Sequence, residues 1–175
     1  MVDLTLIVDF RQQIFNDALF SLEQAKKIDS IKQPFEYWKY CTWSIVAACM
    51  CMEAYIKSHI KVIIESDSDV EEVYQSYGHI GMYKNIKFIE DSTGNNIIDA
   101  SDANWRNIAN TIQLRNDIVH YNRYDIFNSL TIMNAENAIK ACRDFIKKFH
   151  VAMDMSYANF APWIDKTQSE NYDGT

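Results

Sequence analysis

Residues 34–65 read PFEYWKYCTWSIVAACMCMEAYIKSHIKVIIE, and this stretch decides the fold class. Pro34 suits the first turn of a helix, where the N–H that proline lacks has no partner to lose. The residues that follow are apolar on most sides of a helix. The sequence therefore predicts a long central helix from about Pro34 to Glu65, with other helices packed around it.

Three further long helices are predicted on either side of this one. Apolar residues recur at helical spacing over residues 9–28, 103–119 and 134–155. Ser101 or Asp102 is placed to cap the second of these segments. Residues 66–102 are more polar and contain glycine turn signals, so we expect short helices and loops there. The predicted organisation is one domain, residues 1–160, followed by a flexible tail, residues 161–175.

The composition agrees with an all-α fold of four to five main helices. The 175 residues include only four glycines and two prolines, too few for the many tight turns of a sheet-rich protein. The net charge of −7 argues against a broad basic surface that holds nucleic acid, although it leaves room for a small local RNA site. The spacing of the four cysteines fits no metal site, and we expect the three that lie in one apolar segment, residues 41–51, to behave as small buried hydrophobes. No metal or other cofactor is expected.

Membrane and secretory signals are not recognised in the sequence. Asp3 and Asp9 lie where a signal peptide would need its basic and apolar regions. The longest uncharged run, residues 40–52, is shorter than the roughly 20 residues of a membrane span. We therefore expect a cytoplasmic protein without a membrane partner.

Two charged residues lie on apolar helix faces. Arg115 falls between Ile112 and Val119 on the stripe of the 103–119 helix, and Glu53 falls on an apolar face of the central helix. Because an unpaired buried charge is unfavourable, we expect Glu53 and Arg115 to pair between two packed helices. The alternative is a pair between Glu53 and Lys57, one turn later on a partly solvated face.

His120 follows five residues after Arg115, in the run RNDIVH from residue 115 to residue 120. In one continuous helix the two side chains would point about 140° apart. They would converge only if the helix ended near Ile118 or if a second subunit contributed one of them. A single histidine after a helix is also compatible with a purely structural role.

The run Arg115-Asn116-Asp117-Ile118-Val119-His120 resembles the R-x4-6-H motif of the HEPN superfamily, a group of small all-helical domains. A polar residue after the arginine is usual there, and Asn116 fits. Many members carry an acidic residue in a preceding apolar helix, as Glu53 does here. The resemblance implies a HEPN-like helical bundle that acts as a metal-independent endoribonuclease, often a toxin or an anti-phage effector.

The resemblance also implies roles for individual residues and for partners. His120 would act as acid or base in the attack of an RNA 2′-hydroxyl on phosphorus, while Arg115 would bind the phosphate. Asn116 would orient the histidine or the phosphate, and Glu53 would hold Arg115. Tyr121 is a supporting candidate, although the tyrosine that some toxin members carry two residues after the histidine is replaced by Asn122. The implied partners are a second copy of the chain, an RNA substrate and an antitoxin protein.

Two other functions remain compatible with the sequence. In one, the protein is a non-catalytic helical module for dimerisation or interaction, and the Glu53–Arg115 pair is structural. In the other, it is a nucleotide-binding module. The sequence contains no glycine-rich phosphate loop, so such a module would have to bind the nucleotide in another way. Lys147, Lys148 and His150 would form a small basic patch that complements the dipole of the last helix.

Overall fold

The protein is described here by a computed structural model, which covers residues 4–66, 74, 81–99, 101–120, 125–155 and 161–166. Within these residues every regular element is a helix, which confirms the all-α prediction. The elements are α1 (Leu4–Lys27), α2 (Pro34–Ser66), α4 (Met82–Thr93), α5 (Ala103–His120), the short 3-10 helix η1 (Ile126–Ser129) and α6 (Ile132–Ala152).

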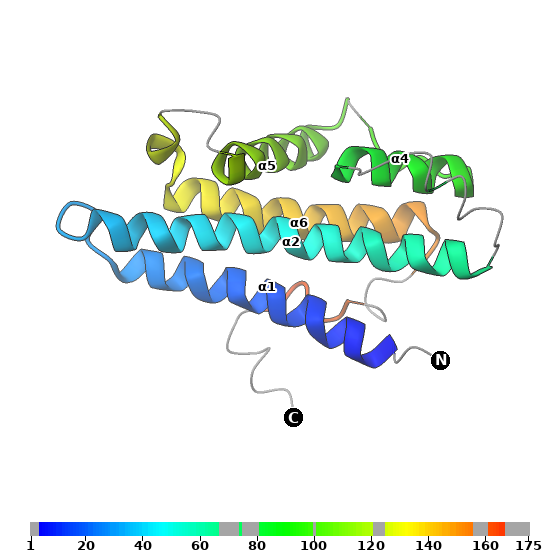
Figure 1. Cartoon of the computed structure of the whole chain (residues 1–175), viewed down its shortest axis with the longest axis horizontal. Coiled ribbons are helices and arrows are strands. Elements are labelled where there is room, and N and C mark those ends of the chain that lie inside the picture. The colour runs from blue at the N-terminus through cyan, green and yellow to red at the C-terminus, as the bar shows by residue number, and fades with distance from the viewer. Residues whose placement is uncertain are drawn as a thin grey trace.

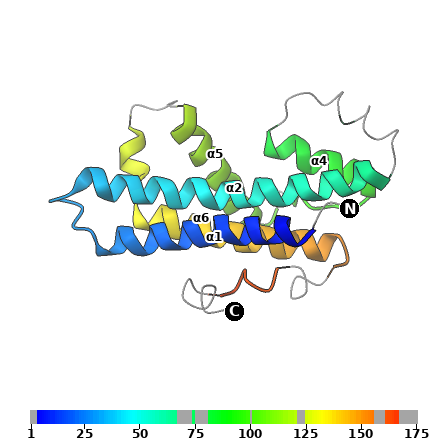
Figure 2. The same cartoon turned by 60° about the horizontal axis from the view of Figure 1, so that its bottom comes forward.

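The long helices α1, α2 and α6 lie side by side, and α4 and α5 cover one side of this layer (Figures 1 and 2). Helix α2 is central, because it packs against α1, α6, α4 and α5. The predicted starts of α2 at Pro34 and of α5 at Ala103 are confirmed. The shared core includes fully buried side chains from four helices, such as Phe15, Tyr55, Ile108 and Phe145. All four cysteines are buried and free, including the three of α2 that were expected to behave as small hydrophobes.

Side-chain caps set two of the helix starts. Asp102 accepts a hydrogen bond from the Asn104 backbone N–H (2.8 Å) and so caps α5. Thr131 accepts one from the Asn134 N–H (3.2 Å), which explains why α6 begins at Ile132 rather than at the predicted Asn134. The expected end at Met155 is also wrong, since the helix stops at Ala152. Helix α1 starts at Leu4, five residues before the expected Asp9.

The polar middle segment contains α4 and a loop tied to it. Gly94 ends α4 with a positive φ of 73°, the left-handed conformation that glycine adopts without strain. Glu90 then holds the following loop, because its Oε1 accepts hydrogen bonds from the N–H groups of Ile97 and Ile98, both at 2.7 Å. Ile97 is buried against the core. The expected short helix and loop are therefore present in this segment.

The predicted flexible tail is wrong for residues 161–166. Ala161, Trp163 and Ile164 are buried, and the Trp163 ring lies 5.5 Å from the Phe15 ring of α1. Arg143 Nε on α6 donates to the Ile164 carbonyl oxygen (2.8 Å). The segment packs because two large apolar residues follow Pro162 and find a surface between α1 and α6. Residues 167–175, the rest of the predicted tail, lie outside the described part of the chain.

Candidate functional site

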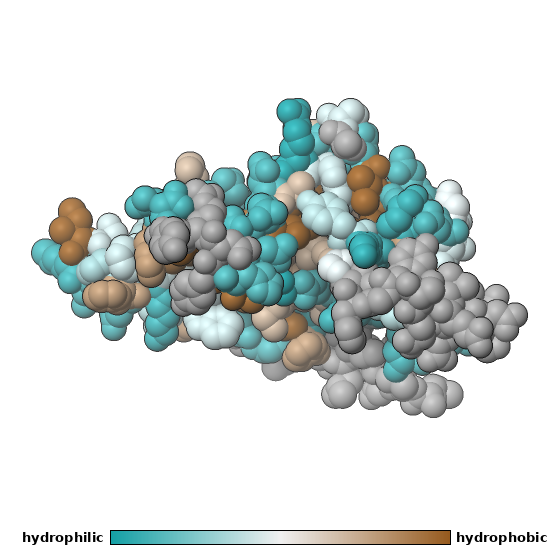
Figure 3. Space-filling view, turned by 45° about the horizontal axis from the view of Figure 1, so that its top comes forward, coloured by the Kyte–Doolittle hydropathy of each residue, from teal (hydrophilic) through white to brown (hydrophobic). Residues whose placement is uncertain are grey.

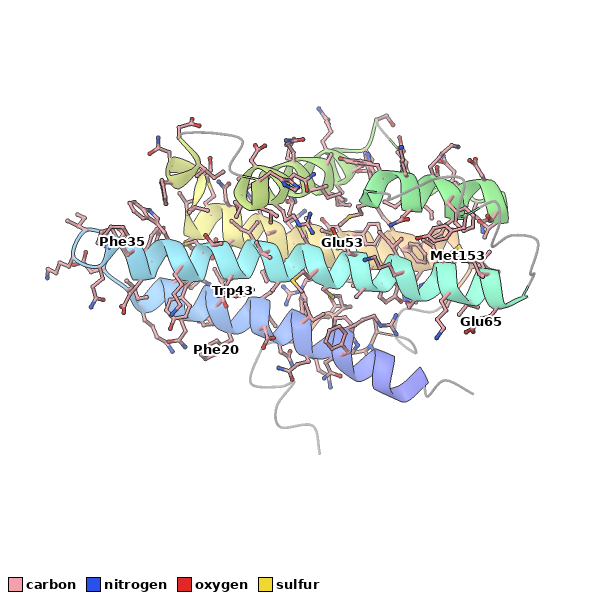
Figure 4. All side chains as sticks on the ribbon, in the orientation of Figure 1. Phe20, Phe35, Trp43, Glu53, Glu65 and Met153 are labelled. Atoms are coloured by element: carbon pink, nitrogen blue, oxygen red, sulfur yellow. The ribbon has the colours of Figure 1, made fainter. Side chains whose placement is uncertain are left out.

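The predicted interhelical ion pair between Glu53 and Arg115 is present. Arg115 Nη2 on α5 lies 2.9 Å from Glu53 Oε1 on α2. Glu53 lies on the edge of α2 that faces α5 (Figure 4). The partner of Glu53 is therefore Arg115 on another helix, and the alternative pair with Lys57 is not formed. A second hydrogen bond joins Arg115 Nη1 to Asn116 Oδ1 (3.0 Å), so both terminal nitrogens of the guanidinium are engaged.

The pair is less buried than the sequence suggested. The Arg115 side chain is 22% exposed and the Glu53 side chain 26% exposed. Figure 2 shows the reason: the C-terminal end of α5 rises away from α2 and α6. Val119, which was expected on the buried stripe, is exposed for the same reason. The stripe of α5 therefore starts in the core at Trp105 and Ile108 and leaves it before Val119.

A buried cysteine lies next to the ion pair. Cys49 on α2 is fully buried there, and its thiol donates to the Thr111 carbonyl oxygen of α5 (3.7 Å). Burial raises the pKa of the Cys49 thiol to about 12, so it is protonated and unreactive at neutral pH. Arg115 Nε is buried without a hydrogen-bond partner among the described residues. The guanidinium is thus engaged through its two terminal nitrogens, while its Nε is buried.

His120 is the last residue of α5, and its side chain is exposed. The helix continues without a break through Ile118, so the first condition for bringing His120 and Arg115 together is not met. At 100° per residue the two side chains leave the helix about 140° apart. Within one chain, α5 joins Arg115 with Asn116 and Glu53 but directs His120 elsewhere.

Two residues that were named with the motif lie outside the described part of the chain. They are Tyr121, which was expected to support the motif, and Asn122, which replaces the tyrosine of some toxin members.

A second polar cluster, which was not predicted from the sequence, lies between α1, α2 and α6. Arg11 on α1 is buried, and its Nη1 donates to Ser58 Oγ of α2 (3.0 Å). Its guanidinium also lies 4.7 Å from the centre of the Tyr55 ring, which is a cation–π arrangement. The same signal that revealed Arg115 could have revealed Arg11, since it lies three and four residues before the buried Ile14 and Phe15.

Two histidines complete this Arg11 cluster. The Tyr55 hydroxyl hydrogen-bonds with His150 Nε2 of α6, and His59 Nδ1 donates to the Tyr55 carbonyl oxygen (2.9 Å). Burial, followed by the nearby Arg11 charge, lowers the pKa of His59 and that of His150 to about 4. Both rings are therefore neutral at pH 7.

The expected basic patch at the end of the last helix is wrong. His150 is completely buried, because it lies four residues after the core residue Ile146. Lys147 pairs with Asp165 (2.6 Å), and Lys148 pairs with Asp102, the cap of α5. These lysines fasten neighbouring segments to α6.

Metal binding, membrane insertion and kinship with known proteins each bear on function. Among the described side chains, no group of three or more histidines, cysteines or carboxylates could hold a metal ion. In the same part of the chain, no helix combines the length and apolar character required to cross a membrane. Comparison with protein-family models, curated proteins and solved structures found no match.

Proposed function

We propose that this protein is a metal-independent endoribonuclease of the HEPN type that acts as a homodimer. The observation that carries the proposal is the Glu53–Arg115–Asn116 arrangement: a guanidinium held at the surface by a carboxylate of one helix and an amide of another. His120 lies exposed at the end of the same helix. The ion pair between Glu53 and Arg115 is the contact that the resemblance to the R-x4-6-H motif implies, and it supports the proposal.

The proposed chemistry uses each of these groups. In this mechanism the His120 imidazole takes the proton of an RNA 2′-hydroxyl as that oxygen attacks the adjacent phosphorus, because histidine is the side chain that most often serves as a general base. The bond from phosphorus to the 5′-oxygen breaks, that oxygen takes a proton from water, and His120 returns its proton to the solvent. The products are a 2′,3′-cyclic phosphate and a 5′-hydroxyl. Arg115 stabilises the charge that develops on the phosphate oxygens, since its two terminal nitrogens carry four N–H donors and only two are used by Glu53 and Asn116.

The proposal requires a second copy of the chain. Because α5 is continuous, Arg115 and His120 of one subunit point in different directions. Arg115 of one subunit therefore acts with His120 of the partner subunit across a shared surface. The Glu53 carboxylate keeps the guanidinium in one orientation while the substrate is absent.

The second candidate function is a non-catalytic helical interaction module. The same continuity of α5 favours it, as does the fact that Arg115 already has two partners within its own chain. In this alternative the ion pair only fastens α5 to α2, and His120 has no chemical role.

RNA cleavage by variants separates the two candidates. His120→Ala is expected to keep its helical content and to cleave RNA about 10²–10⁴-fold more slowly. Arg115→Ala is expected to lose cleavage and some stability, whereas Arg106→Ala, an exposed arginine on the same helix, serves as the matched control. Cleavage is expected to persist in a chelator and to stop when the 2′-hydroxyl at the cut site is replaced by hydrogen.

Two results would reject the ribonuclease. Wild-type protein that leaves a broad panel of structured and single-stranded RNAs intact would favour the interaction module. RNA cleavage that is unchanged in His120→Ala would rule out the proposed mechanism, whatever the source of the cleavage.

A further inference from the structure

Helix α2 carries an apolar stripe on the side that faces solvent. Trp43 is 53% exposed and Met50 is 39% exposed, with the partly exposed Val46 and Ala54 beside them. These four residues, the α2 stripe, recur at spacings of three and four and so lie on one face of the helix. A tryptophan and a methionine on one exposed helix face, two turns apart, are typical of an interface.

The other sides of α2 are occupied, which fixes where the stripe points. Cys51 and Ser58 contact α1, while Cys49 and Glu53 contact α5. At 100° per residue the α2 stripe lies between these two edges, opposite the side that packs on α6. Figure 1 shows α2 in front, with no described element across its outward side. The face that carries α4 and α5, by contrast, is mostly hydrophilic where its described residues are visible (Figure 3).

We propose that the α2 stripe is the contact between two copies of this chain, with the two α2 helices antiparallel across a two-fold axis. The midpoint of Trp43 and Met50 lies between residues 46 and 47. With the axis at that point, Trp43 of one copy packs against the partner's Met50, and the two Val46 side chains meet near the centre. Each contact then occurs twice, as a two-fold interface requires.

The charged residues at the ends of the stripe fit the same register. Glu36 and Lys57 are both exposed, and their midpoint also lies between residues 46 and 47. Each is about 16 Å from the axis, at 1.5 Å per residue. Antiparallel packing therefore sets Glu36 opposite the partner's Lys57, twice. Parallel packing would instead set Glu36 opposite the partner's Glu36 and Lys57 opposite the partner's Lys57, which is repulsive.

Two further lysines lie near this face. Lys39 comes opposite the partner's Ala54, and its Nζ lies 5.1 Å from the centre of its own Tyr40 ring. Lys61 reaches beyond Pro34, the first residue of the partner's α2, and lies 3.6 Å from Glu65 of its own chain. The charge pairing in the contact is therefore that of Glu36 and Lys57.

The choice of a second copy follows from this self-complementarity. An unrelated partner would have no reason to match a stripe whose apolar and charged pairs share one midpoint. A two-fold axis perpendicular to α2 in the contact plane also leaves both α5 helices on the same edge of the dimer. This assembly is thus compatible with the homodimer of the proposed function. The contact surface is tested without RNA, so the result of that test does not depend on whether the protein cleaves RNA.

Sedimentation equilibrium of the purified full chain tests the surface. We expect a dimer at tens of micromolar. Trp43→Glu should raise the dissociation constant at least about 30-fold, because a central tryptophan dominates such contacts. Val151→Glu, an exposed apolar residue on α6, is the matched control and should leave the constant unchanged. Circular dichroism checks that each variant is folded, and Met50→Lys replaces Trp43→Glu if that variant is not.

A charge swap tests the register. Glu36→Lys and Lys57→Glu should each weaken the dimer about 5–10-fold, since each change affects two ion pairs. The double variant should return to within about threefold of wild type. A chain that stays monomeric at about 200 µM, or a dimer that Trp43→Glu weakens no more than Val151→Glu, would overturn the surface. A double variant no better than the single ones would overturn the antiparallel register.

Discussion

Acidification from pH 7 to pH 5 should destabilise the fold through the two buried histidines. His59 and His150 have pKa values of about 4 in the folded protein, against about 6.5 in an unfolded chain. Between these values the unfolded state binds protons that the folded state does not. The free energy of unfolding therefore falls as the pH drops below 6.5, and the loss is complete near pH 4.

The size of the effect follows from the same pKa values. One histidine shifted from 6.5 to about 4 loses at most about 1.8 kcal/mol between pH 7 and pH 5. The sum for the two histidines is smaller than twice this value, because His59 is partly exposed to solvent and both rings lie near the same cation, Arg11. We therefore expect the free energy of unfolding to fall by about 2 kcal/mol in total. Carboxylates contribute little in this window, since their ordinary pKa values lie near 4.

Urea denaturation followed by tryptophan fluorescence measures this loss directly. The double variant His59→Gln/His150→Gln should show a much flatter dependence on pH between 7 and 5. His120→Gln is the matched control, because that histidine is exposed, and it should keep the wild-type dependence. A wild-type change below about 0.5 kcal/mol would refute the reasoning, as would an equal slope in the double variant.

Three further changes test the packing. Glu53→Ala should lower the free energy of unfolding by about 1–2 kcal/mol in a urea titration, less than for a fully buried pair. The double variant Glu53→Met/Arg115→Leu should recover most of this loss. A loss below about 0.3 kcal/mol would show that the ion pair is negligible. Glu90→Ala should lower the stability by about 2–3 kcal/mol, because it leaves the N–H groups of Ile97 and Ile98 without an acceptor. Glu90→Gln keeps an acceptor oxygen and should lower the stability less. Equal losses in the two variants would contradict this account. Trp163→Ala should lower the stability by about 3 kcal/mol in thermal denaturation. Val151→Ala, at an exposed position, should lower it by less than about 0.5 kcal/mol. Similar values for the two variants would mean that residues 161–166 do not support the core.

Local patterns determined the helices and one contact between them. The spacing of apolar residues and the position of Pro34 predicted α2, and the same spacing with a capping residue predicted the start of α5. The ion pair was predictable because two charges on apolar faces, with opposite signs, have few ways to be compensated. Such inferences succeed because helical periodicity and charge compensation act within a few turns of chain.

Only the tertiary structure decided how deeply each face is buried. The tilt of α5 away from α2 leaves Arg115 half-buried and Val119 exposed, although both lie on the stripe that starts in the core. The Arg11 cluster forms because α1, α2 and α6 bring together residues almost a hundred positions apart, such as Tyr55 and His150. Residues 161–166 pack for the same reason, since their binding surface is made by α1 and α6 together. Sequence periodicity predicts which face of a helix is apolar, but the neighbouring helices determine which part of that face is buried against protein and which part is exposed to solvent.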